Sequence, residues 1–264
     1  MRGGLRRAAG IVLGAFILAS TAAHADVFSE GNIRASFDGW LTPKALPRTD
    51  PVPVELHLRG SLRTTDNGQL PVLRRIEVSV NRFGRISTAG LPVCRKRSIV
   101  ATTTRQALAA CGDALVGNGR FNAFIALPAE APFPARGRML AFHAKVDGRQ
   151  VILAHIYGTD PLPTSQVMTM VIKHPKGRSA FGTILSMTVP KVGNDDWGHV
   201  TGFRMNLHRR YAYKHQTRSV ISANCPAPKG FDVGVFTAAK ATYYLAGGRT
   251  ISRVVTGTCR IRNP

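Results

Sequence analysis

Between Gly90 and Phe124 the sequence reads GLPVCRKRSIVATTTRQALAACGDALVGNGRFNAF, and this stretch holds the one clear helix signal in a chain otherwise rich in strand patterns. Thr103 and Gln106 stand three residues apart where that signal begins. Each side chain can cap the backbone of the other, which is the arrangement of a capping box. Good helix formers follow, and Gly112 suits the left-handed residue just past a helix end. The stretch therefore predicts one short helix.

A cysteine stands at each end of this helical segment, and the chain has four cysteines in all. No Cys-x-x-Cys spacing occurs, which favours disulfides over a metal site in an exported chain. Four cysteines allow three pairings. We prefer Cys94 with Cys111 and Cys225 with Cys259, because each bond then closes a local unit. With both pairs oxidised, a thiol nucleophile is not expected.

The first 25 residues have the pattern of a secretory signal peptide. Three arginines lie within the first seven residues, an apolar run covers Ile11–Ala19, and Ala23-His24-Ala25 fits the small-x-small cleavage rule. Cleavage leaves Asp26 as the first residue of the mature chain. We expect a secreted, extracellular or cell-wall-associated protein without stable membrane insertion after cleavage. The alternative is an uncleaved anchor, for which the apolar run is short.

The charge balance limits the choice of partners. Lysine and arginine number 36 and the acidic residues 14, which gives a net charge of +22. Loss of the signal peptide removes three arginines and no acid, so residues 26–264 carry +19. Most cations cannot find a partner within such a chain. A field of this sign attracts anionic polymers such as wall polymers, acidic polysaccharides or extracellular nucleic acid.

Residues 26–264 predict a single antiparallel β-sandwich with one short helix and two disulfides. Residues 54–59 and 76–81 alternate strictly between apolar and polar side chains, as half-buried strands do. A hairpin is expected where residues 139–146 and 149–157 flank Asp147-Gly148. Residues 158–166 are the best candidate for a linker or a crossover between sheets, and a split into two lobes there remains open.

The hairpin also contains two histidines, His143 and His155, whose position decides whether they can share a metal ion. A two-residue turn pairs Val146 with Arg149, and the histidines then lie on opposite faces of the sheet. A three-residue turn puts them on one face but about 13 Å apart along the strand, too far for one ion. Neither a metal nor another cofactor is expected.

Several short motifs give the chain a family resemblance. GLPVC, the Ala-Cys end of the helix, ILAHIYGTDPLPTS, NCPAPKGF and LAGGRTIS together resemble a group of secreted actinobacterial proteins with no assigned activity. The resemblance covers most of the mature chain. It implies export and a shared fold, and it transfers no functional residue.

The densest acidic spot is the segment Asn194-Asp195-Asp196-Trp197-Gly198-His199. Asp195, Asp196 and His199 could bind a cation, act as acid and base, or meet a sugar ring. The competing interpretation is a solvated turn whose tryptophan packs inward. No other motif indicates catalysis, since the chain has no Gly-x-Ser-x-Gly elbow, no His-Glu-x-x-His and no glycine-rich phosphate loop.

The richest cationic run lies at residues 207–218, LHRRYAYKHQTR. Interpreted as one strand, it places Arg210, Lys214 and Arg218 on one face and Tyr211 and Tyr213 on the other. This basic stripe is either an ordinary solvated surface backed by packed tyrosines or a track for a polyanion.

The sequence thus favours a secreted, non-catalytic β-sandwich that binds an anionic extracellular or cell-wall polymer. Two alternatives stay open. One is a secreted hydrolase of envelope or environmental glycan that uses the Asp195/Asp196 loop. The other is a binder or inhibitor of an acidic protein, which the basic face would meet.

Overall fold

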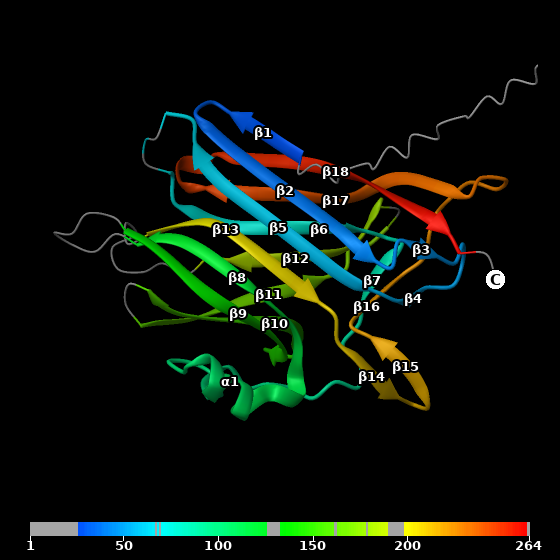
Figure 1. Cartoon of the computed structure of the whole chain (residues 1–264), viewed down its shortest axis with the longest axis horizontal. Coiled ribbons are helices and arrows are strands. Elements are labelled where there is room, and N and C mark those ends of the chain that lie inside the picture. The colour runs from blue at the N-terminus through cyan, green and yellow to red at the C-terminus, as the bar shows by residue number, and fades with distance from the viewer. Residues whose placement is uncertain are drawn as a thin grey trace, which may run out of the picture.

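The computed structural model describes residues 26–66, 68, 70–125, 133–160, 163–177, 179–189 and 198–262, and these fold into strands with one short α-helix (Figure 1). The all-β class predicted from the sequence is confirmed. Within the described ranges, no helix is long and apolar enough to cross a membrane. The helix α1 spans Thr104–Cys111, and short 3₁₀ turns occur at Lys96–Ser98, Gly112–Ala114 and Ala246–Gly248.

The strands of the first half are β1 (Asp26–Glu30), β2 (Ile33–Thr42), β3 (Ala45–Leu46), β4 (Val52–Pro53), β5 (Glu55–Thr64), β6 (Leu73–Asn81), β7 (Gly84–Ile86), β8 (Leu115–Ile125) and β9 (Phe133–Val146). Those of the second half are β10 (Arg149–Asp160), β11 (Thr164–Lys173), β12 (Phe181–Thr188), β13 (Gly198–Leu207), β14 (Arg210–Tyr213), β15 (Gln216–Ser219), β16 (Ile221–Ala223), β17 (Val233–Leu245) and β18 (Thr250–Ile261).

Thirteen of these strands form one sheet in the order β1-β2-β5-β13-β8-β9-β10-β11-β12-β6-β17-β18-β3. Strands from both halves of the chain alternate in this order, so residues 158–166 do not divide the sheet. Residues 158–160 end β10 and residues 164–166 begin β11, and these two strands pair with each other, with Gly158 opposite Thr164. The expected linker or crossover is wrong at this place. Two small sheets, β14-β15 and β4-β16-β7, complete the fold.

The large sheet curls until its two ends face each other, and β2 and β5 cross over β17 and β18 in Figure 1. Tyr243 of β17 connects the two layers. Its hydroxyl donates a hydrogen bond to the backbone oxygen of Ser36 on β2 (3.2 Å), and its ring centroid lies 6.3 Å from that of Phe28 on β1. The inner faces of both layers share one apolar core. A single curled sheet therefore supplies both layers of the sandwich.

The predicted hairpin around Asp147-Gly148 is confirmed. Both residues have positive φ, 50° and 74°, as a two-residue turn requires, and Val146 pairs with Arg149. This register pairs His143 with Ile152 and His155 with Leu140, so the two imidazoles lie on opposite faces of the sheet, as the two-residue turn predicts.

The helix α1 packs on the outer face of β9 and β10, over a second apolar cluster that includes Ala107, Phe142 and Leu153. Its capping box is confirmed, because Thr103 Oγ1 accepts from the Gln106 N–H (3.3 Å) and Gln106 Oε1 accepts from the Thr103 N–H (2.9 Å). The expected left-handed Gly112 is wrong. That glycine has a right-handed helical φ of −55°, because the chain continues directly into a 3₁₀ turn.

Both predicted disulfides are present. Cys94 and Cys111 lie 5.3 Å apart at their Cα atoms, and Cys225 and Cys259 lie 5.7 Å apart. The first bond fixes α1 to the sheet, because Cys94 forms a bridge with Ala144 of β9 and its N–H donates to the backbone oxygen of the neighbouring residue in β9. The second ties the segment after β16 to β18.

Candidate anion-binding site

Four arginines stand side by side across four neighbouring strands on the outer face of the sheet. In the antiparallel register, Arg204 of β13 is directly opposite Arg59 of β5 on one side and Arg120 of β8 on the other. Arg120 is in turn opposite Arg138 of β9. We call this set, Arg59, Arg204, Arg120 and Arg138, the arginine row. Tyr157 of β10 continues the same line beyond Arg138.

Without a bound anion, the arginine row lowers the stability of the folded state. Residues directly opposite in an antiparallel pair have Cα atoms roughly 4.5–5.5 Å apart, and like charges at that spacing repel and destabilise the sheet. One member of the row has a counter-charge, since Arg59 Nη2 lies 2.7 Å from the buried carboxylate of Asp38. The other three are exposed, and within the described ranges none of them forms an ion pair or a side-chain hydrogen bond.

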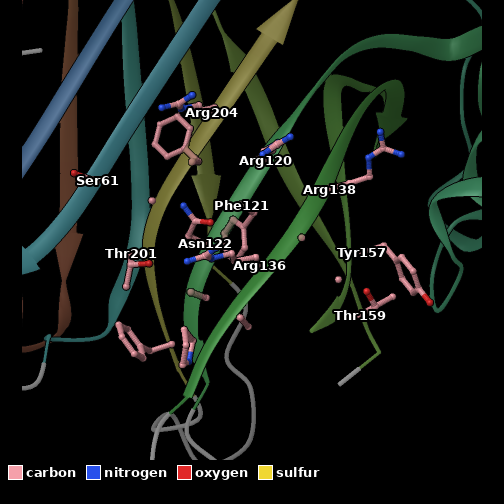
Figure 2. Close-up of a pocket in the computed structure, with 18 of the residues that line it drawn as sticks. Ser61, Arg120, Phe121, Asn122, Arg136, Arg138, Tyr157, Thr159, Thr201 and Arg204 are labelled. Atoms are coloured by element: carbon pink, nitrogen blue, oxygen red, sulfur yellow. The ribbon is translucent and has the colours of Figure 1, made fainter. Parts of the chain in front are cut away.

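The row lines an open trough with a volume of 1390 Å³. Arg136 of β9 and Arg105 of α1 add two further guanidinium groups to its walls, and no aspartate or glutamate is among the described residues that line it. Figure 2 shows Arg204, Arg120 and Arg138 following one another on three strands, with Tyr157 beyond them. Six arginines therefore line one open space, and Arg59 alone among them has a carboxylate partner within the described residues.

A second row of residues runs beside the arginines, two positions further along each strand, and Ser36, Ser61 and Asn122 supply its small polar side chains. Ser36, Ser61, Gly202, Asn122 and Arg136 are aligned there by the same strand register. The hydroxyls of Ser36 and Ser61 lie 2.6 Å apart and bond to each other. These groups supply hydroxyl and amide donors next to the cations, which is the combination that recognises an anion together with neighbouring polar atoms.

The local sequence explains why the arginines point outward. In each strand, the residues on either side of the arginine face the opposite side of the sheet, toward the core. In β8 these residues are Gly119 and Phe121. Gly119 is required where it stands, because a Cβ there would lie 2.0 Å from the backbone oxygen of Arg204. Only glycine lets β8 approach β13 closely enough to bring Arg120 opposite Arg204 at this twist.

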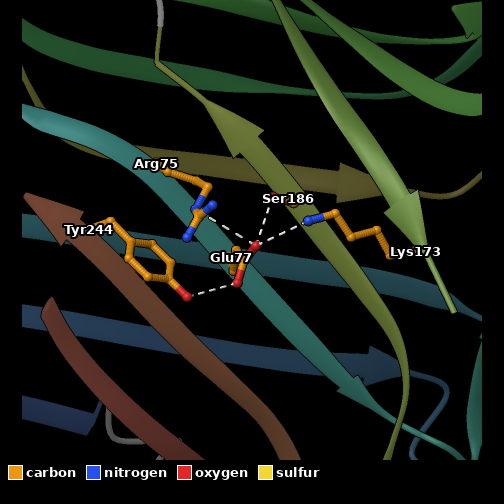
Figure 3. A network of polar contacts seen from close by, with 5 residues as sticks. All are labelled: Arg75, Glu77, Lys173, Ser186 and Tyr244. Atoms are coloured by element: carbon orange, nitrogen blue, oxygen red, sulfur yellow. Dashed lines mark hydrogen bonds and ion pairs between the residues drawn. The ribbon is translucent and has the colours of Figure 1, made fainter. Parts of the chain in front are cut away.

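A second charged cluster on the outer face is paired and provides a contrast (Figure 3). Glu77 of β6 accepts hydrogen bonds from the hydroxyls of Ser186 and Tyr244, both 2.9 Å, and lies 3.4 Å from Lys173 and 3.7 Å from Arg75. Burial by itself raises the pKa of Glu77, but these hydrogen bonds and cations together hold the pKa below its ordinary value. The cations of this cluster have a carboxylate partner within the protein, so the cluster stabilises the fold and needs no ligand.

The stripe predicted from residues 207–218 does not form as expected. The chain turns at Lys214 and His215, which both have positive φ, and makes the two-stranded hairpin of β14 and β15. Arg218 is consequently opposite Tyr211, on the face that holds the tyrosines, and Arg210 lies on the other face. The prediction of a single strand was wrong. The sequence has no glycine or proline at Lys214 and His215 to signal the turn.

Two of the three cations nevertheless converge on one aromatic ring. Lys214 Nζ lies 5.7 Å and Arg218 Cζ 5.1 Å from the ring centroid of Tyr213. Tyr213 packs against Gly90, where an added Cβ would lie 2.2 Å from the ring. The hairpin is therefore a small basic surface held by its tyrosines, separate from the trough.

The acidic loop can be placed only in part. Asp195 and Asp196 lie outside the described residues. His199 lies in β13, opposite Phe124 of β8, and its side chain is buried. It lines a hollow together with Arg34 and Arg63, and this hollow shares Phe124 and Thr201 with the arginine trough.

The two hairpin histidines have separate structural partners. His143 Nδ1 lies 2.8 Å from the backbone oxygen of Pro92 and Nε2 contacts Gln150, while His155 Nε2 lies 3.0 Å from the backbone oxygen of Thr102. Burial lowers the pKa of His155, although its hydrogen bond to Thr102 opposes that effect. Among the described residues, no group of three or more His, Cys, Asp and Glu side chains is placed to hold a metal ion.

No model of a known protein family matches the chain, and neither a curated protein nor a solved structure is detectably similar to it.

The arginine row was missed at the sequence level. Its members come from positions 59, 120, 138 and 204, and none belongs to a cationic run. The available signal was weak. Each arginine occupies a polar position in an alternating strand, as in Gly-Arg-Phe at 119–121 and Phe-Arg-Met at 203–205. Such a pattern predicts exposure of each arginine and contains no information about which strands become neighbours.

Proposed function

We propose that this protein is a secreted, non-catalytic β-sandwich that binds an anionic polymer in the arginine trough. The arginine row carries the proposal. A fold that aligns four like charges across neighbouring strands loses stability, and a ligand that supplies the missing negative charges recovers it. A polymer with regularly spaced anionic groups fits a row of regularly spaced cations better than a single small anion does.

The remaining features of the chain support the same proposal. The signal-peptide pattern and two disulfides suit an extracellular setting, where wall polymers, acidic polysaccharide and free nucleic acid occur. The net charge of +19 on residues 26–264 draws such polymers toward the surface from a distance. The hydroxyl and amide row beside the arginines supplies directional contacts once the polymer is bound.

The test is a salt titration of binding to fluorescently labelled oligo-dT and to inorganic polyphosphate. Log affinity should fall linearly with log salt, because each neutralised phosphate releases condensed counterions. If Arg120, Arg138 and Arg204 each contact one phosphate, replacing all three with Gln should flatten the slope for oligo-dT by roughly two, at about 0.7 per contact.

A charge-matched control separates a site from general basicity. Arg210, Lys214 and Arg218 together carry three positive charges and lie outside the trough, so their triple change to Gln removes the same charge. We expect the trough variant to lose at least about tenfold more affinity than this control at the same salt concentration. Equal losses from the two variants would show that net charge alone attracts the polymer.

A further inference from the structure

A further hollow, separate from the trough and from the hollow beside His199, opens between the two layers at one end of the sandwich. It has a volume of 340 Å³ and is lined by β2 and β5 of one layer and by β6, β17 and β18 of the other. Its walls are mainly apolar and include Leu41, Val80, Phe83 and Phe236. The volume lies within the range of about 300–1,000 Å³ that is usual for small-molecule sites.

This hollow is unlike an ordinary packing defect. Protein interiors are close-packed, and empty space in an apolar core costs stability in proportion to its volume. Deeper in the same layers, Phe37 and Tyr243 are almost completely buried. Leu41, Val80 and Phe236 pack against the core but are only partly buried where they border the hollow. An apolar occupant would cover these side chains.

Three of the polar side chains in the wall already have partners. Asn224 Nδ2 donates to the backbone oxygen of Arg48 (2.9 Å), Asn81 Oδ1 accepts from the N–H of Phe83 (3.0 Å), and the carboxylate of Asp38 pairs with Arg59. Lys44 is the only lysine or arginine among the described lining residues. Its side chain is exposed and lines the hollow, and its ammonium has no partner within the described residues. The backbone there is fixed, because Lys44 O accepts from the N–H of Arg260 (3.0 Å).

We propose that the hollow binds a small amphiphile with an apolar body and a single anionic head group that pairs with Lys44. A water molecule occupies roughly 30 Å³ in the liquid, so the space holds a body of about ten heavy atoms. A carboxylate with a medium-length acyl chain matches both the size and the charge. The site is independent of the arginine trough.

Decanoate, decan-1-ol and decylamine are the probes, because they share an apolar chain and differ in the charge of the head. Each probe is titrated into the intact oxidised protein by isothermal titration calorimetry. We expect one binding site, with the affinity highest for decanoate, lower for decanol and lowest for decylamine. Lys44→Ala should weaken decanoate roughly threefold to fivefold, as expected for an exposed ion pair, and leave decanol unchanged. Lys145→Ala, an exposed lysine of β9 away from the hollow, should change neither.

A second variant tests the hollow itself. Val80→Phe places a larger apolar side chain in the space, so it should abolish binding of both decanoate and decanol while the melting temperature stays the same or rises. The arginine-trough triple variant should bind decanoate as the wild type does. The proposal fails if the wild type binds none of the probes, if Val80→Phe binds them undiminished, or if decanoate affinity follows the trough arginines and not Lys44.

Discussion

Arg204 of β13 lies directly opposite Arg120 of β8, and neither side chain has a counter-charge within the described residues. Such a pair opposes folding, and Arg59 and Arg138 extend it on both sides. The arginines that line the trough therefore lower the stability of the free protein and favour the binding of an anionic ligand.

Arg120→Gln should stabilise the protein in the absence of ligand. It removes one charge and with it the repulsion from two cross-strand neighbours, Arg204 and Arg138, each of which costs about 0.2–1 kcal/mol. The free energy of unfolding from urea titrations at low salt should rise by about 0.5–2 kcal/mol. The gain should shrink as added salt screens the repulsion. Arg210→Gln, which removes a charge from the β14–β15 hairpin, is the control, and a loss of stability in Arg120→Gln would contradict the repulsion.

The two disulfides should contribute unequally to thermal stability. Cys225 and Cys259 are 34 residues apart, whereas Cys94 and Cys111 are 17 apart. The chain-entropy model gives about 4 kcal/mol for the longer loop and about 3 kcal/mol for the shorter. Replacing both cysteines of the longer loop with Ser should therefore lower the melting temperature more than replacing both cysteines of the shorter loop. The reverse order would show that attachment of α1 to the sheet limits stability.

Glu77→Gln should destabilise the protein at neutral pH and much less in acid. The contacts of Glu77 hold its pKa below the ordinary value of 4.5, so the ionised carboxylate stabilises the folded state above that pH. This stabilisation is lost as the pH falls through the folded-state pKa. We expect a loss of about 1 kcal/mol at pH 7, from urea unfolding, that narrows toward pH 3. A pH-independent difference would mean that only packing was changed.

His155 should make the protein less stable in mildly acidic solution. Burial lowers the pKa of His155 below the ordinary value of 6.5. Between the two pKa values the imidazole is therefore protonated in the unfolded chain and neutral in the folded protein. Stability from this residue is present above about pH 6.5 and falls as the pH drops toward the folded-state pKa. The free energy of unfolding should therefore fall less between pH 7.5 and 5.5 in the His155→Gln variant than in the wild type, as measured by urea unfolding. His174→Gln, at the exposed turn after β11, is the matched control and should behave as the wild type does.

Local structure followed from the sequence because it depends on residues close together in the chain. The capping box of Thr103 and Gln106 needs a spacing of three residues, and the turn at Asp147-Gly148 needs two residues that tolerate positive φ. That turn also settled which faces His143 and His155 occupy. The same reasoning failed at Lys214-His215, where two residues without a turn signature reverse the chain. The tyrosines beside them contact the turn at Ala89 and Gly90, which lies far away in the sequence.

Composition and spacing alone indicated an all-β, strongly basic protein, because both properties come from counts and short-range patterns. They favoured two local disulfides among three possible pairings, and the structure supplied the pairing. Tertiary structure decided where the charge is concentrated. Arg59, Arg120, Arg138 and Arg204 become neighbours only when β5, β13, β8 and β9 pair in that order, and the apolar hollow exists only because two ends of one sheet close over each other. Strand order and register depend on how the apolar faces of distant segments pack, and no local pattern encodes which segments will meet.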